Sequence, residues 1–432
     1  MQLNKEILKL SIPNILSNLS VPLLSSVDLM LIGHLNKSSY IGAVAIGGMI
    51  FGFLYWSFGF LRMGTTGVTA QAYGRDDRYK LSVTLYRSLF ASFVIAFAIF
   101  ILQSFIKDTA FSLVDASKEV EILAKNYFSI RIFDVFAVLS LYALNGWLMG
   151  MQNARYTMFI VVFTNFLNII LDFIFIYGLN MDVKGVALGT VLSQYAGVFL
   201  ALYLIKKEYK NRLFRINLKE IFHIEEIIEF FKLNMDIFIR TISLIFAFSF
   251  FTAQSALYGD DILAANTILM QLWTVFAYGI DGFAFASESL IGKYITKDKK
   301  TLKKVIKRIF IWGFGLGAVF SFVFFLFPKD IISLFTNNQT VIDIALVYIG
   351  YTIIAPLVNS FCYLWDGIYL GATASKSLRN SMLTAVFLIY LPTYYLTRDI
   401  LHNHALWISM IVLMMARGIL LGMKAKRVIF KT

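Results

Sequence analysis

The chain has 432 residues, of which 59% are hydrophobic and 15% are charged, and its formal net charge is +13. Soluble proteins carry about 25% charged residues, so this composition excludes an ordinary soluble domain and indicates a multi-pass membrane protein. Because Lys and Arg gather in short loops between apolar stretches, the basic excess favours anionic lipid headgroups over nucleic acid as the partner.

Twelve apolar stretches are long enough to cross a bilayer, which takes about 20 residues in a helix. The first begins near Ile7 and continues past Asp28 without a small-residue cleavage pattern, so we interpret it as a retained span rather than a signal peptide. In chain order the predicted helices cover residues 8–35, 40–70, 81–106, 122–150, 156–179, 183–205, 223–257, 262–292, 306–328, 340–370, 377–398 and 404–423.

The charges of the loops predict the orientation of these helices. Loops after even-numbered helices are basic, as in the segment Lys206–Lys219, whereas loops after odd-numbered helices hold more acid, as at Asp260 and Asp261. Cytoplasmic loops carry the excess of positive charge. We therefore expect a protein of the cytoplasmic (inner) membrane with both termini in the cytoplasm.

The second half of the chain repeats the first with a constant shift of 221 residues, as from Ala43 to Ala264 and from Gly150 to Gly371. Six spans per half keep the same orientation, which is typical of parallel repeats in transporters. The predicted organisation is an N-terminal lobe at 1–205, a basic cytoplasmic linker at 206–222 and a C-terminal lobe at 223–432.

The fifth predicted helix contains an isolated acid. Asp172 is the only charged residue between Tyr156 and Gly178, and Asn168 stands one turn earlier on the same helical face. A charged side chain near the middle of a bilayer costs about 2.5–3.5 kcal/mol, so it normally faces a partner or water. An amide and a carboxylate in this arrangement predict half of a cation or proton site.

Several motifs resemble those of one transporter family. VPLLSSVDLMLIGHL (residues 21–35) and GFLRMGTTGVTAQAYGRDD (59–77) are similar to the first two spans of multidrug and toxic compound extrusion (MATE) transporters. DIFIRTISL (236–244), LAANTILMQL (263–272), YGIDGFAFASESLIGK (278–293) and WDGIYLGATAS (365–375) resemble the DNA-damage-inducible F (DinF) branch. The resemblance covers essentially the whole chain. It implies an all-α fold of twelve helices in two pseudo-symmetric six-helix lobes around a central cleft, and export of amphipathic organic compounds driven by inward Na⁺ or H⁺ flow.

The resemblance also assigns roles to individual residues. It implies a cation or proton site in the N-terminal lobe, and a first-span proline that acts as a bending point. An acid in the tenth span matches one that other branches use for coupling. In this sequence the site falls on Asp28, Asn168, Asp172 and Thr190, the bending point on Pro13 and the tenth-span acid on Asp366.

Each of these residues also has a plainer interpretation. Asp28 follows Ser25 and Ser26 and would then lie near the outer interface. Thr190 would bond the backbone carbonyl one turn back. Pro13 would be an ordinary kink of a membrane helix.

Other charged residues in the spans occur at helical spacings. Asp236 and Arg240 are one turn apart, as expected of either a structural ion pair or a gating pair. Arg131 is expected to pair with Asp134, three residues later. Further candidates for coupling in the C-terminal lobe are Asp281 and Glu288, two turns apart on one face of the eighth span, and Asp366.

Aromatic and sulfur-containing side chains are abundant, with 42 Phe, 22 Tyr, 6 Trp and 15 Met. Such surfaces bind flat lipophilic cations, because Met repacks and aromatic faces attract positive charge. The candidates for a substrate cleft are Trp56, Phe60, Met149, Trp273 and Trp365, and packing between helices is the alternative for each of them.

Enzymatic motifs are lacking in the sequence. It has no Gly-x-x-x-x-Gly-Lys-Ser/Thr motif for ATP, no catalytic triad and no metal-ligand spacing among its four His residues. Its single Cys362 excludes a disulfide within the chain.

The sequence therefore predicts a monomeric secondary antiporter for amphipathic organic compounds, which we expect to be cationic, with no cofactor besides the coupling ion. One alternative is a flippase for lipids or lipid-linked oligosaccharides, although a pyrophosphate needs a basic cavity and the spans hold more acids than bases. The other alternative is a receptor or channel that does not transport, against which the half-chain duplication speaks.

Overall fold

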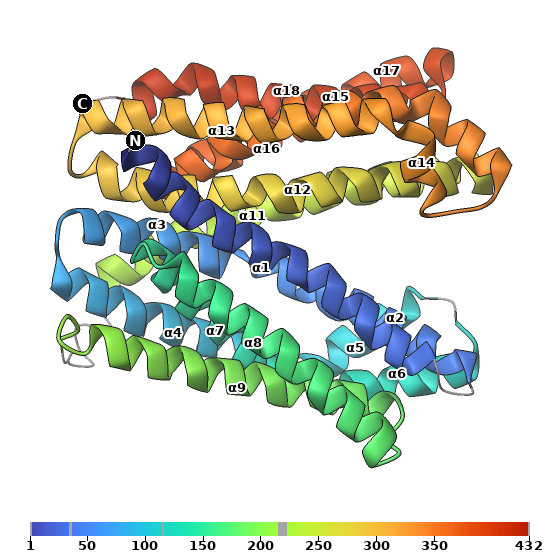
Figure 1. Ribbon diagram of the computed structural model, residues 1–432, viewed down its shortest axis with the longest axis horizontal. Helices are drawn as coiled ribbons and strands as arrows, with labels where there is room; N and C mark the ends of the chain where they lie inside the picture. The colour runs from blue at the N-terminus through green and yellow to red at the C-terminus, as the bar shows by residue number, and fades with distance from the viewer. Residues whose placement is uncertain (1, 34–36, 115, 215–222, 431–432) are drawn as a thin grey trace. The chain divides into compact units, whose positions relative to one another are not determined.

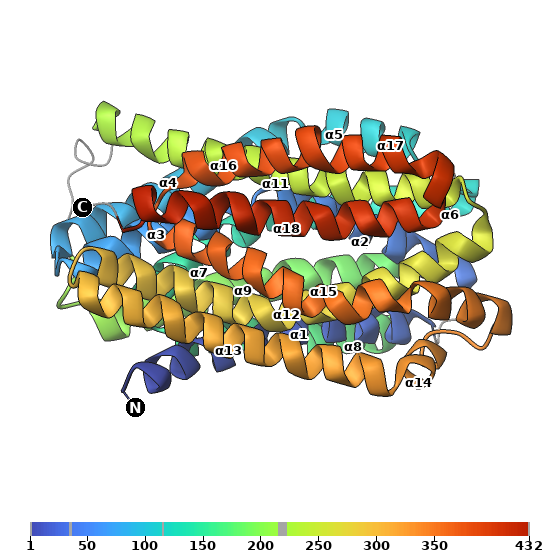
Figure 2. The ribbon, with the colours of Figure 1, turned by 90° about the horizontal axis from the view of Figure 1, so that it is seen from above.

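The computed structural model describes residues 2–33, 37–114, 116–214 and 223–430, and every regular element in this part of the chain is helical (Figures 1 and 2). The first half contains α1 (Gln2–Gly33), α2 (Ser38–Ser57), α3 (Phe60–Gly74), α4 (Arg78–Ile101), α5 (Gln103–Ser112), α6 (Lys118–Arg131), η1 (Ile132–Asp134), α7 (Val135–Gly150), α8 (Ala154–Phe173), η2 (Ile174–Gly178) and α9 (Val183–Tyr209). The second half contains α11 (Ile224–Ala256), α12 (Asp260–Ile295), α13 (Lys299–Leu326), α14 (Pro328–Ser333), α15 (Gln339–Gly371), α16 (Ser375–Leu383), η3 (Thr384–Tyr390), α17 (Leu391–Leu401) and α18 (Asn403–Val428).

The predicted set of twelve membrane helices is confirmed. Ten helices or continuous helical runs of the described chain are long and apolar enough to cross a membrane. The two other predicted spans correspond to α1 and to the run from α16 through η3 to α17. The predicted second span, 40–70, is interrupted at Phe58 and Gly59, where α2 ends and α3 begins.

The half-chain duplication is visible in the helix bounds. When shifted back by 221 residues, α15 coincides with the run from Lys118 to Gly150, which comprises α6, η1 and α7. The same shift places the first residue of α16 on Ala154, the first residue of α8. The two halves are therefore structural repeats.

The chain divides into two compact units, which we call the N-terminal unit (Leu16–Ile227) and the C-terminal unit (Met1–Ile15 with Ile228–Thr432). The start of α1 thus belongs to the C-terminal unit, where Glu6 accepts a hydrogen bond from Tyr294 of α12 at 2.8 Å. The start of α11 belongs to the N-terminal unit, where Glu226 pairs with Arg87 of α4 at 2.8 Å. Residues 215–222 of the expected linker lie outside the described chain.

Short polar side chains begin many of the helices, as expected at helix N-termini, where backbone N–H groups lack a partner within the helix. Asp182 accepts a hydrogen bond from the backbone N–H of Lys184 at the start of α9. Asp298 does the same for Lys300 at the start of α13, and the hydrogen bond from the Thr301 hydroxyl lowers the pKa of Asp298.

Small residues bring helices close together within each unit. In the N-terminal unit, α8 lies along α9 (Figure 1), and Gly189 and Gly197 of α9 face α8. A Cβ atom at Gly189 would overlap Oδ1 of Asp172, and one at Gly197 would overlap the Thr164 hydroxyl. In the C-terminal unit, α15 packs against α12, α13 and α18 (Figures 1 and 2). Small residues at such interfaces allow membrane helices to approach closely.

Two spans of the described chain contain a π-helical turn. The turn η2 follows Asp172 almost directly, and the N–H of Leu179 donates to the carbonyl of Ile174 at 3.0 Å. The second turn, η3, lies in the eleventh span between α16 and α17. Such turns are rare in proteins and often accompany functional sites.

Candidate functional site

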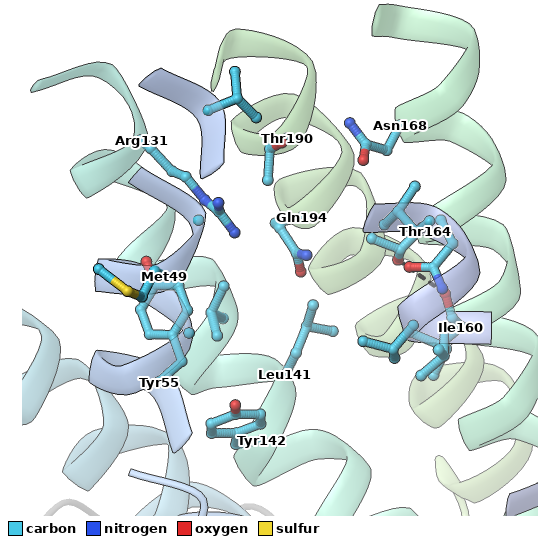
Figure 3. Close-up of a pocket in the computed structure, with 18 of the residues that line it drawn as sticks. Met49, Tyr55, Arg131, Leu141, Tyr142, Ile160, Thr164, Asn168, Thr190 and Gln194 are labelled. Atoms are coloured by element: carbon cyan, nitrogen blue, oxygen red, sulfur yellow. Dashed lines mark hydrogen bonds between the residues drawn. The ribbon is translucent and has the colours of Figure 1, made fainter. Parts of the chain in front are cut away.

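A cavity of about 690 Å³ lies inside the N-terminal unit (Figure 3). This volume falls within the range of about 300–1,000 Å³ that is usual for small-molecule sites. Helices α1, α2, α6, α7, α8 and α9 all contribute to its lining. The polar side chains among the described lining residues are Tyr55, Tyr127, Arg131, Tyr142, Asn145, Thr164, Asn165, Asn168, Thr190 and Gln194.

The wall formed by α8 includes the predicted amide, and the predicted carboxylate of Asp172 lies one turn further along α8, outside the described lining. Asn168 and Asp172 are both fully buried, and Nδ2 of Asn168 donates a hydrogen bond to Oδ1 of Asp172 at 3.1 Å. Oδ1 of Asn168 has no hydrogen-bond partner among the described residues, although Asn168 lines the cavity. A buried oxygen without a donor costs free energy. This wall therefore presents an acceptor suited to a cation or to a donor group.

Thr190 of α9 also lines the cavity, close to Gln194 in Figure 3. Its hydroxyl donates to the backbone carbonyl of Val186 at 2.9 Å, which is the plainer interpretation given above. The oxygen of this hydroxyl retains a lone pair, so the bond does not prevent Thr190 from acting as an acceptor.

The family resemblance predicts that Asp28 belongs to the same site, and its backbone lies in α1. Its side chain lies outside the described part of the structure. Val21 and Leu24 of the same helix line the cavity. Pro13 also lies in α1, which is helical through this position, and the division between the compact units falls two residues later, after Ile15.

The wall formed by α2 and α6 is organised around an ion pair. Nε of Arg131 lies 3.4 Å from Oδ2 of the fully buried Asp134, which confirms the expected pairing of these residues. The Tyr55 hydroxyl donates to Oδ1 of Asp134. Nη1 of Arg131 donates to the Tyr127 hydroxyl at 2.5 Å. Arg131 and the two tyrosines reach the cavity, whereas Asp134 lies behind them.

The C-terminal unit holds a buried cluster of two arginines and one acid. Asp366 of α15 accepts hydrogen bonds from Arg240 of α11 and, at 2.6 Å, from Nη2 of Arg417 of α18. Arg417 is almost completely buried. The expected pairing of Asp236 with Arg240 is therefore wrong. Asp236 pairs instead with Arg379 at 2.6 Å, because α16 approaches this part of α11.

The other predicted positions of the C-terminal unit lie on α12. Glu288 is fully buried, whereas Asp281 is partly exposed. Nearby packing is tight, because a Cβ atom at Gly371 would overlap the backbone carbonyl oxygen of Glu288. Glu288 thus lies at the interface between α12 and α15.

The five predicted cleft residues are dispersed. Trp56 is 47% exposed, while Phe60, Met149, Trp273 and Trp365 are buried. None of the five is among the described residues that line the cavity. Met49 is the methionine that lines it.

Several cavity residues were not singled out from the sequence. Asn145 is 9% exposed, and its Oδ1 has no partner among the described residues. Gln194 follows Thr190 by one helical turn. Isolated amides within apolar spans, at one-turn spacing from another polar residue, are the signal that could have identified them, because helix geometry places such residues on one face.

Comparisons with known proteins agree on one family. The MatE family model matches residues 13–174 and 237–396. The DNA damage-inducible protein F of Escherichia coli (strain K12) is 36% identical over 97% of this chain and 91% of its own length. The multidrug export protein MepA of Staphylococcus aureus (strain N315) is 22% identical over 91% of this chain and 88% of its own length.

Among solved structures, the outward-facing conformation of a multidrug resistance MATE family transporter of the MOP superfamily superimposes with a TM-score of 0.87 at 20% identity. The alignment covers 100% of this chain and 97% of the other. At this identity the likeness shows the fold alone. Together with the family match in both halves, it shows that the chain belongs to the multidrug and toxic compound extrusion (MatE) family.

Proposed function

We propose that this protein is a secondary antiporter that exports amphipathic organic compounds in exchange for Na⁺ or H⁺. Substrate and coupling ion would alternate at the cavity of the N-terminal unit. The observation that carries the proposal is the pair Asn168 and Asp172, a buried amide and carboxylate in a membrane helix, with one amide oxygen left without a described partner at the cavity wall.

The chemistry of this wall suits either ion. The Asp172 carboxylate and the oxygens of Asn168 and Thr190 are hard oxygen donors of the kind that Na⁺ prefers, and Asp28 would add a second carboxylate. Asp172 is also a buried acid that can take a proton. Coupling requires only that the ion and the substrate favour different conformations of the protein, each by its own differential affinity.

The duplication supports an ion site in the first half. The 221-residue shift places Asn168 on Ile389, Asp172 on Thr393 and Thr190 on Ile411, so the second repeat does not reproduce the set. Asp366, which matches a tenth-span acid that other branches use for coupling, hydrogen-bonds to two arginines. We therefore assign coupling to the N-terminal unit.

The alternative of a flippase for lipid-linked sugars is less favoured. A pyrophosphate carries several negative charges and needs several bases, but Arg131 is the one base among the described residues that line the cavity. We further propose that the protein lies in the inner membrane of a bacterium with both termini on the cytoplasmic side, as the charges of the loops indicate. A monomer is sufficient for this function.

Efflux from everted membrane vesicles tests this function. Ethidium or norfloxacin should move under a Na⁺ gradient, a pH gradient or both, each imposed separately. Asp172→Asn should abolish gradient-driven efflux and preserve folding, because it removes the ionisable group and retains the shape. Asp182→Asn is the matched control: it removes an acid at the start of α9, and asparagine is an equally good helix cap.

The two variants make the experiment decisive. Loss of efflux in Asp172→Asn alone, with a normal unfolding midpoint in detergent, would support the assignment. No efflux by the wild-type protein under either gradient would contradict the drug-export function. Unchanged efflux in Asp172→Asn would remove Asp172 from the ion site.

A further inference from the structure

The second wall of the cavity presents a fixed guanidinium group. In Figure 3 the side chain of Arg131 extends from α6 into the cavity towards Gln194. Its guanidinium carbon lies 5.0 Å from the ring centre of Phe51 and 5.5 Å from that of Tyr127. These aromatic faces, together with the bonds to Asp134 and Tyr127, hold the group in one position.

Only some of the N–H donors of this guanidinium form hydrogen bonds with described residues of the protein. Of its five N–H donors, those on Nε and Nη1 reach Asp134 and Tyr127. No described residue accepts a hydrogen bond from Nη2. Asp134 also accepts a hydrogen bond from Tyr55 through its other oxygen, Oδ1, so both of its oxygens are bonded. The inner edge of the guanidinium is thus anchored, and the Nη2 donors remain for a molecule in the cavity.

The remainder of the described lining suits an amphipathic molecule with an anionic group. Arg131 is the only described lining residue with a formal charge at neutral pH, and Met49, Leu141 and Ile160 supply apolar surface. A Cβ atom at Gly48 or Gly52 would meet nothing within 4 Å, so α2 leaves open space at these lining positions. A flat ring system placed there would be close to the wall that holds Arg131.

We propose that Arg131 is a specificity-determining residue that binds a carboxylate or a similar single anionic group on the exported molecule. This inference rests on the proposed function and deepens it: the favoured substrates are zwitterionic or acidic amphiphiles rather than simple lipophilic cations. The planar guanidinium fork matches a carboxylate, and its prior fixation by Asp134 and Tyr127 reduces the entropy lost on binding. Asp134 acts as a positioning residue behind it.

The competing interpretation is that Arg131 serves only to neutralise Asp134. The two interpretations differ in what they predict for ligands of different charge. A purely structural arginine would affect all ligands alike through loss of folding. An anion-binding arginine discriminates between two ligands that differ only in the anionic group.

A pair of dyes makes this distinction: a rhodamine with a free carboxylate, and its methyl ester. Their affinities are measured by fluorescence polarisation with the purified full-length protein. The wild-type protein should prefer the carboxylate. Arg131→Gln should weaken carboxylate binding about ten- to a hundredfold, the value of one charge-assisted hydrogen bond, with little change for the ester.

Two further variants complete the set. Arg131→Lys keeps the positive charge but loses the planar guanidinium group, so its affinity for the carboxylate dye should lie between those of the wild type and Arg131→Gln. Arg131→Lys also replaces Arg131→Gln as the test variant if the latter does not fold. Arg87→Gln is the matched control, because Arg87 is a buried, ion-paired arginine of α4 that is not among the described lining residues. It should change neither affinity.

The outcomes separate this inference from the proposed function. The role of Arg131 would be overturned if Arg131→Gln weakened the binding of both dyes equally, or if the wild-type protein preferred the ester. Neither result would affect the antiporter function, provided that gradient-driven efflux is observed. Binding of neither dye, with ethidium efflux intact, would also overturn it. Absence of efflux under either gradient, whatever the dyes do, would instead contradict the antiporter itself.

Discussion

At the scale of single residues, the carboxylate of Asp172 contacts the side-chain amide of Asn168 and lies against Gly189 of the neighbouring helix. Asn168 donates to its Oδ1, and the same oxygen lies where a side chain at Gly189 would be. The position of the carboxylate is therefore set by two helices. Transport should depend on the absence of a side chain at Gly189 as much as on the acid itself.

Gly189→Ala tests this dependence. The added methyl group must displace the carboxylate of Asp172 or separate α8 from α9, so overpacking should lower the free energy of unfolding by about 1–3 kcal/mol. Gradient-driven efflux should fall, because the displaced carboxylate no longer stands beside the Asn168 amide. The measurements are the thermal unfolding midpoint in detergent and efflux from everted vesicles.

Gly315→Ala serves as the control for this substitution. Gly315 lies within α13, and a Cβ atom there would meet nothing within 4 Å. Helix propensity alone should make this variant neutral or more stable by up to about 1 kcal/mol. If Gly189→Ala behaves like Gly315→Ala in both assays, the close contact between Gly189 and Asp172 is not needed for stability or transport.

The sequence predicted side-chain partners correctly where both partners lie on the same helix, a few residues apart. The pairing of Arg131 with Asp134 and the stacking of Asn168 over Asp172 follow from spacings of three and four residues on a helix. Asp236 and Arg240 have the same spacing, yet each finds its partner on another helix, at Arg379 and Asp366. Helical spacing cannot reveal such partners, because tertiary packing decides between them.

At the scale of helices, the cluster of Arg240, Asp366 and Arg417 joins α11, α15 and α18. One carboxylate serves two guanidinium groups, so the cluster carries a net positive charge inside a membrane unit. Charges at this depth are stable only when paired and hydrogen-bonded. We infer that the cluster fixes the packing of these three helices.

Asp366→Asn should destabilise the protein by about 3–5 kcal/mol, because it leaves two arginines buried without a counter-charge. The unfolding midpoint in detergent measures this loss. Asp343→Asn is the matched control in the same helix: Asp343 is exposed and accepts a hydrogen bond from Gln339, and its change should stay within about 0.5 kcal/mol. A small effect of Asp366→Asn would contradict a structural role.

Helix positions were predictable to a large extent, because a bilayer demands long apolar segments with all backbone groups bonded internally. The span expected at 340–370 is observed at Gln339–Gly371. Interruptions within spans were not predicted. The break between α2 and α3 and the turn η1 before Val135 lie within apolar sequence, where hydropathy gives no signal. The cavity depends on side chains from six helices and therefore on packing that hydropathy does not describe.

At the scale of the whole molecule, α1 and α11 each have residues in both compact units. The units divide after Ile15, and Pro13 lies within the same helical turn. A proline removes one helical hydrogen bond and so lowers the cost of bending at that point. We therefore retain the hypothesis that Pro13 is the hinge of the conformational cycle.

Pro13→Ala should leave substrate binding intact and slow transport, because alanine restores the hydrogen bond and stiffens the helix. Binding is measured with the rhodamine dyes, and transport as the initial rate of ethidium efflux. Pro22→Ala is the control, since Pro22 lies in the same helix beyond the division. Transport by Pro13→Ala at the wild-type rate would exclude the hinge.

The two π turns interrupt the structural correspondence between the two repeats. The 221-residue shift places Ile174, the first residue of η2, on Tyr395, but η3 begins at Thr384. The two turns therefore do not occupy equivalent positions in the two repeats. A π turn accommodates one residue more than an α-helical turn, and one residue rotates everything beyond it by about 100°. Each turn therefore re-aims a different segment of its span, and the backbones of the two repeats differ at these positions.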